Sequence, residues 1–121
     1  MKTKKWYFPD MYYPAKSNGD EYVSHECFSI LNCADITCSI SITLYFEEQE
    51  PIELLPVTCS PRRTLHFRID KAKTKNNTPV PQGIGYAGIV TCSNMDAIVQ
   101  YTRVDTTQPQ LALMTTMGYS M

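Results

Sequence analysis

The most constraining feature of this sequence is a strict alternation of apolar and polar residues in segment 39–46. Ile40, Ile42 and Leu44 occupy every second position, and Ser, Thr and Tyr residues lie between them. Because successive side chains of a strand point to opposite faces, the alternation predicts a half-buried β-strand.

Segment 63–69 repeats this alternation and contains the first candidate site. Its apolar residues, at positions 65, 67 and 69, share one face of the predicted strand. The residues on the opposite face are Thr64, His66 and Arg68. Strand geometry alone brings these three side chains to one surface, where Arg and His offer donors for carboxylate, phosphate or sugar hydroxyls. The alternative interpretation is a plain solvent face, since outward polar residues are the rule in half-buried strands.

Further short apolar or β-branched runs are separated by clusters of Gly, Pro, Asn, Asp and Ser, which favour turns. They lie at 23–31, 52–59, 86–92, 97–104 and 111–119. Eight prolines disfavour long helices, and only segment 108–117 has a spacing that would also suit one. About seven or eight short strands with regular turn signals predict an antiparallel sandwich or barrel.

A chain of 121 residues is expected to form one domain, 1–121, because this length buries roughly two thirds of its unfolded surface around a single core. Within it, we expect residues 1–11 to be an irregular N-terminal segment. We expect 70–85, which is rich in Lys, Asn, Pro and Gly, to be a long loop.

The pattern of charge, apolar segments and cysteines predicts a soluble cytoplasmic protein. The net charge is -1, which argues against a surface that is basic as a whole. No apolar run approaches the ~20 residues that cross a bilayer, and the start lacks the apolar stretch of a signal peptide. Five cysteines make an odd number, which favours reduced thiols over a disulfide framework.

Segment 62–75 is locally basic, with six of the 11 basic residues of the chain. Two interpretations remain open. It is a nucleic-acid or phosphate contact through Arg62, Lys71, Lys73 and Lys75, or it is a solvated loop whose lysines protect a strand edge. Arg63 shares the parity of the apolar residues that follow it, so we expect it to point toward the core or an interface and to find a carboxylate or carbonyl partner.

Two acidic residues, Glu26 and Asp105, lie within or just after apolar strands, where a carboxylate is costly unless it is paired. Arg103 and Asp105 are two residues apart, and therefore project from the same side of an extended segment. We expect them to form a structural ion pair at a strand end or a subunit contact.

The sequence offers weak support for catalysis and for metal binding. His25 and His66 are the only histidines, and no nucleophile motif accompanies them. His25 and Glu26 are neighbours on one strand and point to opposite faces, so Glu26 does not orient that imidazole. The cysteine and histidine spacings do not match a zinc site. We expect no metal and no cofactor.

The candidate residues fall into an ordered set of motifs that spans 12–119. The most specific parts are Arg63-Thr64-x-His66-x-Arg68 and Gln100-x-Thr102-Arg103-x-Asp105. In this order the chain resembles the sensory rhodopsin transducer family of small soluble proteins. The resemblance implies a jelly-roll β-sandwich that assembles into a ring-like homotetramer in the cytoplasm. DNA binding and a likeness to carbohydrate-binding sandwiches have been suggested for that family.

The sequence therefore leads to one main functional hypothesis and two alternatives. The main hypothesis is a non-enzymatic signalling or ligand-binding module that binds a small polar ligand, such as a carbohydrate, or a partner protein, for which a membrane photoreceptor is one candidate. Its site would comprise Thr64, His66 and Arg68, with His25, Glu26 and Gln100 as neighbours. The alternatives are a DNA-contacting regulator that uses segment 62–75, and a sugar-metabolising enzyme that uses a histidine with Glu26 or Asp105.

Overall fold

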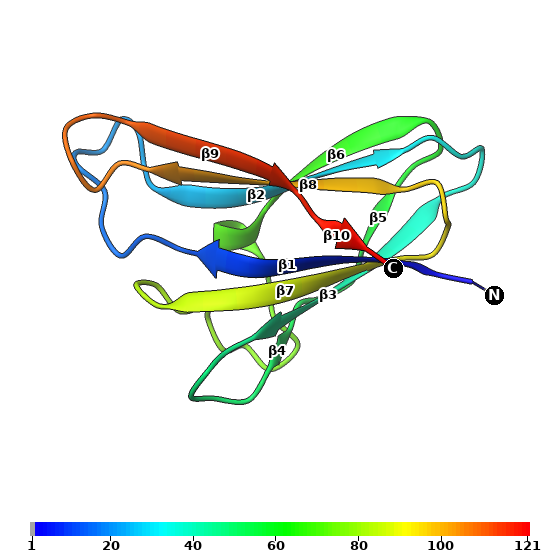
Figure 1. Cartoon of the computed structure of the whole chain (residues 1–121), viewed down its shortest axis with the longest axis horizontal. Coiled ribbons are helices and arrows are strands. Elements are labelled where there is room, and N and C mark those ends of the chain that lie inside the picture. Colours follow the sequence, from blue (N-terminus) through cyan, green and yellow to red (C-terminus); the bar gives the residue numbers. More distant parts are fainter. Residues whose placement is uncertain (1) are drawn as a thin grey trace.

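Strands with one apolar face are stable only when those faces are buried together, and two antiparallel sheets packed face to face achieve this here (Figure 1). The structure, a computed structural model, describes residues 2–121. The six-stranded sheet runs in the order β10-β1-β7-β3-β4, with β5 also paired to β3, and the four-stranded sheet runs in the order β6-β2-β8-β9. The predicted antiparallel β-sandwich is confirmed.

The strands follow the sequence patterns closely. In the six-stranded sheet they are β1 (Lys4–Tyr12), β3 (Cys38–Tyr45), β4 (Ile52–Glu53), β5 (Val57–Cys59), β7 (Gly85–Cys92) and β10 (Tyr119–Ser120). In the four-stranded sheet they are β2 (His25–Asn32), β6 (Arg63–Arg68), β8 (Ile98–Asp105) and β9 (Ala112–Met117). The runs at 52–59 and 111–119 are each divided into two short strands.

The expectation of an irregular segment over 1–11 was wrong for the residues that form β1. This strand pairs with β7 from Lys4 to Tyr12 and buries Trp6, Phe8 and Met11. A register shift between Phe8 and Met11 puts the last buried residue out of phase with the first two, so the sequence shows no simple alternation. Segment 108–117, whose spacing would also suit a helix, contains strand β9.

The expected long loop at 70–85 overlaps one short helix. The 3-10 helix η1 (Ile69–Lys71) follows β6 directly and buries Ile69. Beyond it, Thr74 forms an isolated bridge with Leu54 of the β4–β5 connection. Among residues 2–121, no helix is long and apolar enough to span a membrane.

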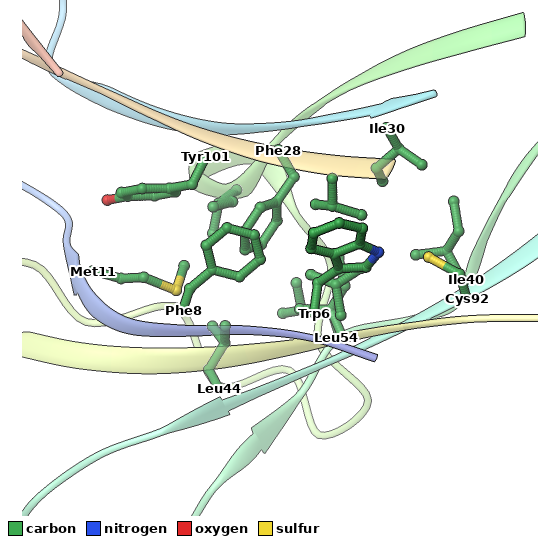
Figure 2. Packing of buried hydrophobic residues seen from close by; sticks show 14 of the residues in the cluster. Trp6, Phe8, Met11, Phe28, Ile30, Ile40, Leu44, Leu54, Cys92 and Tyr101 are labelled. Carbon is green, nitrogen blue, oxygen red and sulfur yellow. The ribbon is translucent and has the colours of Figure 1, made fainter. Parts of the chain in front are cut away.

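The core lies between the sheets and is rich in aromatic side chains (Figure 2). Phe8 of β1 packs against Phe28 of β2 and Tyr101 of β8, with ring centroids 5.0 Å and 6.1 Å away. Trp6 donates from its indole Nε1 to the Ala97 carbonyl at 3.0 Å. This bond satisfies the polar atom of the indole while the ring remains buried.

A buried amide organises the loops at one end of the sandwich. Asn32, the last residue of β2, is fully buried. Its Nδ2 donates to the carbonyls of Ile36, Cys59 and Ser60 at 2.9–3.1 Å. Its Oδ1 accepts from the Ala34 amide and from Asn94. One side chain thereby satisfies the backbone of several turns that would otherwise be left unpaired.

Gly118 between β9 and β10 is required by the core. A Cβ at this position would lie 2.6 Å from Cζ of Phe8, and that ring is buried and cannot move away freely. We expect Gly118→Ala to lower the free energy of unfolding by about 1–3 kcal/mol, the usual cost of forcing extra volume into a packed site. Chemical denaturation measures this.

Gly85→Ala is the matched control, because a Cβ there has no heavy atom within 4 Å. Equal stability of the two variants would contradict the packing argument.

Candidate functional site

The outer face of the four-stranded sheet carries most of the sequence-predicted site. Strand register places Ser29 of β2 between His66 of β6 and Gln100 of β8. The next row joins Thr64, Leu31 and Ile98 in the same way. We call the surface formed by Thr64, His66, Ser29, Gln100, Leu31 and Ile98 the outer face.

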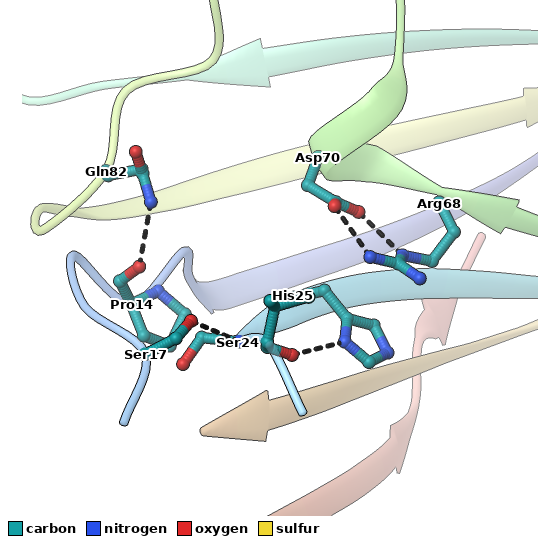
Figure 3. Close-up of polar contacts among 8 residues, drawn as sticks. Pro14, Ser17, Ser24, His25, Arg68, Asp70 and Gln82 are labelled. Carbon is teal, nitrogen blue, oxygen red and sulfur yellow. Dashed lines mark hydrogen bonds and ion pairs between the residues drawn. The ribbon is translucent and has the colours of Figure 1, made fainter. Parts of the chain in front are cut away.

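Within the predicted triad, Arg68 differs from the other two residues. Thr64 and His66 are exposed, whereas the Arg68 guanidinium makes a two-pronged contact with the Asp70 carboxylate, with both N–O distances at 2.7 Å (Figure 3). Asp70 raises the pKa of Arg68, because the carboxylate stabilises the charged guanidinium. A pair with this geometry is well ordered, so the donors that Arg68 was expected to offer a ligand are already engaged.

His25 lies on β2 at the same end of the sheet as Arg68. Its Nδ1 contacts the Val23 carbonyl at 2.9 Å (Figure 3). It therefore neighbours the triad, as strand parity implies, but one of its two ring nitrogens is held by the backbone.

Glu26 points to the opposite face of β2 from His25, so the prediction that it lies beside His66 was wrong. The side chain is completely buried between the two sheets. Its carboxyl accepts hydrogen bonds from the hydroxyls of Tyr86 and Tyr101 and, at 3.2 Å, from the Tyr12 amide. Neighbouring residues on a strand point to opposite faces, so β2 divides His25 and Glu26 between the exposed surface and the core.

This buried group, which we call the Glu26 cluster, connects the two sheets. Glu26, Tyr101 and Arg103 come from the four-stranded sheet, and Tyr12 and Tyr86 come from the six-stranded sheet. Burial raises the pKa of Glu26, and the hydrogen bonds from Tyr101, Tyr86 and Tyr12 and the charge of Arg103 oppose this only in part. Burial and the nearby carboxyl also raise the pKa of Tyr86 and that of Tyr101.

The expected ion pair between Arg103 and Asp105 was wrong, because each of these side chains contacts another partner. Arg103 donates from Nε to the Tyr101 hydroxyl at 3.3 Å, and its Nη2 lies 3.7 Å from Oδ1 of Asp10. The guanidinium also lies over the Tyr12 and Tyr101 rings. Asp105 instead accepts from the Thr107 amide at 2.9 Å, a turn contact that lowers the pKa of this carboxyl.

Arg63 was expected to point toward the core or an interface, but it is exposed. Its guanidinium donates to the carbonyls of Pro61 and Arg62 at 3.4 Å and 3.1 Å, so only the expected carbonyl partner is found. The side chain stands at the beginning of β6, where the adjacent turn offers these carbonyls and leaves the guanidinium in solvent.

The basic residues of segment 62–75 do not form one patch. Arg62 precedes β6, while Lys71, Lys73 and Lys75 follow its far end. Lys75 pairs with Glu53 at 3.3 Å and Arg62 lies 4.0 Å from Asp35. The segment thus divides between the two ends of a six-residue strand, and part of its charge is matched by carboxylates.

Sequence reasoning identified Glu26 as an unusual buried acid but missed its partners. Tyr12, Tyr86 and Tyr101 come from three strands that are distant in sequence, and only their pairing in the sandwich brings them to one carboxyl group. The available signal was a carboxylate within an apolar run, which requires hydrogen-bond donors without naming them.

The side chains of the Glu26 cluster are suited to binding and to holding a proton. The cluster contains a carboxyl with a raised pKa and two hydroxyls that donate to it.

Burial raises the pKa of the Cys59 thiol and raises that of Cys92 to about 12, which disfavours nucleophilic thiolates. Across residues 2–121, no group of three or more His, Cys, Asp or Glu residues is arranged to hold a metal ion.

The fold and this arrangement can be compared with known proteins. A family model described as "Anabaena sensory rhodopsin transducer" matches residues 1–120. This chain belongs to that family. The resemblance inferred from the strand motifs is thereby confirmed, and it extends over the β1 segment as well. No curated protein matches the chain.

Two solved structures support the family assignment. The crystal structure of Thermotoga maritima 1070 is 36% identical, with a TM-score of 0.82, and the match covers 96% of this chain and 92% of that one. The Anabaena sensory rhodopsin transducer is 32% identical, with a TM-score of 0.71, and the match covers 84% and 88%. The chain therefore has the transducer fold.

The Glu26 cluster predicts a specific pH dependence of stability. The pKa of Glu26 in the folded protein is raised above its ordinary value of 4.5, so the folded state binds the proton more tightly than the unfolded chain does. The stability that this tighter proton binding contributes is fully present below about pH 4.5. It declines as the pH rises toward the raised pKa of Glu26. Each pKa unit by which folding raises the pKa of Glu26 corresponds to about 1.4 kcal/mol in the free energy of unfolding.

Glu26→Gln resembles the protonated carboxyl and does not ionise, so we expect this decline to be absent from the variant. Denaturant unfolding of both proteins between pH 4.5 and 8 measures the difference. Parallel pH profiles for the two proteins would show that Glu26 does not titrate differently on folding.

Proposed function

We propose that this family member is a non-enzymatic signalling module that binds a partner protein through the outer face. The observation that supports this most directly is the composition of that surface. Exposed Leu31 and Ile98, each with 43% of its surface accessible, lie in the row next to the polar row of His66, Ser29 and Gln100. Apolar side chains interspersed with uncharged polar groups are typical of protein interfaces.

Family membership supports the signalling role. The family and one structural relative are both described as a sensory rhodopsin transducer, and a transducer acts by contacting other proteins. By that analogy a membrane photoreceptor or another signalling protein is the partner we favour, in the cytoplasm.

A small polar ligand such as a carbohydrate is a weaker proposal for the same surface. The Arg68 guanidinium, which would have been its strongest donor, is already paired with Asp70. A DNA contact through Arg62, Lys71, Lys73 and Lys75 is also weaker, because these side chains divide between the two ends of β6. A protein partner requires neither of these features.

The proposed interface predicts that His66→Glu abolishes partner capture without loss of stability. His66 is exposed, so the substitution leaves the core intact and adds a charge to the polar row of the outer face. Wild-type and variant proteins would be immobilised and exposed to the soluble and membrane fractions of the source cells, and bound proteins would be quantified by mass spectrometry.

Thr58→Glu on β5 is the matched control, since Thr58 is an exposed strand residue on the other sheet. We expect this variant to retain every protein that wild type captures. Equal capture by the His66 variant would exclude the outer face as the interface.

We further propose that the chain assembles as a homotetramer, as the resemblance implies. Light scattering coupled to size exclusion should then give four times the 13.8 kDa of one chain at micromolar concentration. A monomer mass under these conditions would overturn the assembly.

A further inference from the structure

The side of the sandwich where β9 and β1 face one another contains a cleft. The two strands belong to different sheets and converge toward β10, where the chain passes from one sheet to the other (Figure 1). A groove of about 310 Å³ lies between them. We call it the side cleft, and its lining consists of Tyr7, Phe8, Pro9, Asp10, Met114, Thr116, Met117 and Tyr119.

Both walls of the side cleft are strand edges with unused backbone groups. β9 is the last strand of the four-stranded sheet, and its described pairing is with β8 alone. The corresponding edge of β1 is covered by β10 at Trp6 and Tyr7. An uncovered edge presents N–H and C=O groups at the spacing that another extended chain requires.

Compared with β1 and β6, the β9 edge lacks the usual protection against strand addition. Residues 106–121 carry no charged side chain, and β9 has no proline and no described register shift. The β1 edge is instead interrupted by Pro9 and by the shift between Phe8 and Met11, and the opposite end strand β6 carries Arg63 and Arg68. Natural proteins protect their edges with such charges, prolines and bulges.

β9 also exposes apolar side chains that a neighbouring strand would cover. Leu113 is 62% accessible and Met117 is 51% accessible. The whole strand is exposed apart from Met114, which is half-buried. An uncharged strand edge with exposed apolar side chains is characteristic of a binding surface.

A guanidinium with one unsatisfied nitrogen lies beside the side cleft. Arg103 is opposite Met114 in the β8–β9 ladder. Among the described residues its buried Nη2 has no hydrogen-bond acceptor. The nearest carboxylate, Asp10, lies 3.7 Å from this atom and has a side chain that is 88% exposed, so an incoming carboxylate can displace it at little cost.

From these contacts we infer that the side cleft binds an extended segment of a partner protein, which adds to β9 as a further strand and presents an acidic side chain to Arg103. The unpaired edge of β9 accounts for the extended form of the segment, and the exposed Leu113 and Met117 for its apolar residues. The unsatisfied Nη2 of Arg103 accounts for the acid. A second copy of this chain fits less well, because its own β9 region brings no acidic side chain. Met117 lies opposite Gln100 at the border of the outer face, whereas Thr116 and Arg103 lie outside it, so substitutions at His66 and at Thr116 test the two proposals separately.

A random dodecapeptide library displayed on phage, selected against the full-length protein, tests the inference. We expect enrichment of peptides with apolar residues at alternate positions and one Asp or Glu. A selected peptide, synthesised with a fluorescent label, should bind wild type and lose at least tenfold in affinity when its acidic residue becomes the amide. Hydrogen exchange of the β9 amides should slow when the peptide is bound.

Thr116→Lys places a charge in the cleft wall at an exposed position and should weaken binding at least tenfold. Thr58→Lys is the same change on an exposed residue of β5 and should leave binding unchanged, as should His66→Glu. Thermal melting confirms that each variant is folded.

Three results would overturn the inference. The first is a library that yields no peptide sensitive to Thr116→Lys, and the second is a selected peptide that protects amides outside β9. The third is a change of oligomeric mass in the Thr116 variant, which would identify the occupant of the cleft as a second copy of this chain.

Discussion

The arrangement of the two sheets depends on one buried carboxyl group. Glu26 accepts hydrogen bonds from Tyr101, on its own sheet, and from Tyr86 and Tyr12, on the other sheet. A carboxyl with no access to solvent is costly unless donors surround it, so these donors and the strands that carry them must be correctly placed. Arg103, stacked over two of the same tyrosine rings, extends this arrangement to the edge of the sandwich.

The same strand that buries Glu26 also supplies the proposed interface. β2 points Glu26 and Phe28 into the core, while Ser29 and Leu31 lie on the outer face. A slip of one residue in its pairing would exchange the two sets, because side chains alternate with a period of two. The Glu26 cluster at one end and the Asn32 hydrogen bonds at the other hold this register. The internal polar groups thereby determine which side chains a partner meets.

Family membership and local geometry address different questions. The match to the transducer family and a TM-score of 0.82 to a solved relative establish the scaffold. A scaffold does not specify a partner, which is recognised by particular surfaces. In this chain two surfaces differ chemically. The outer face mixes polar and apolar side chains on paired strands, whereas the side cleft offers unpaired backbone beside a guanidinium whose Nη2 has no hydrogen-bond acceptor among the described residues. The first suits a flat protein surface and the second an extended segment.

The sequence by itself determined the class of fold and the faces of individual strands. Alternation over 39–46 and 63–69 identified β3 and β6 because strand periodicity is a local property of the chain. The same alternation predicted that Thr64 and His66 share one face of β6. The local pattern did not predict β1, because a bulge interrupts its alternation. It predicted a pair between Arg103 and Asp105, because only residues that are close in sequence can be compared in this way. The true contacts of Arg103 and Glu26 join residues that are distant in sequence, such as Asp10 with Arg103 and Glu26 with Tyr101. Only the packing of the two sheets decides such contacts, because each requires a donor and an acceptor from separate strands to be buried at the same point.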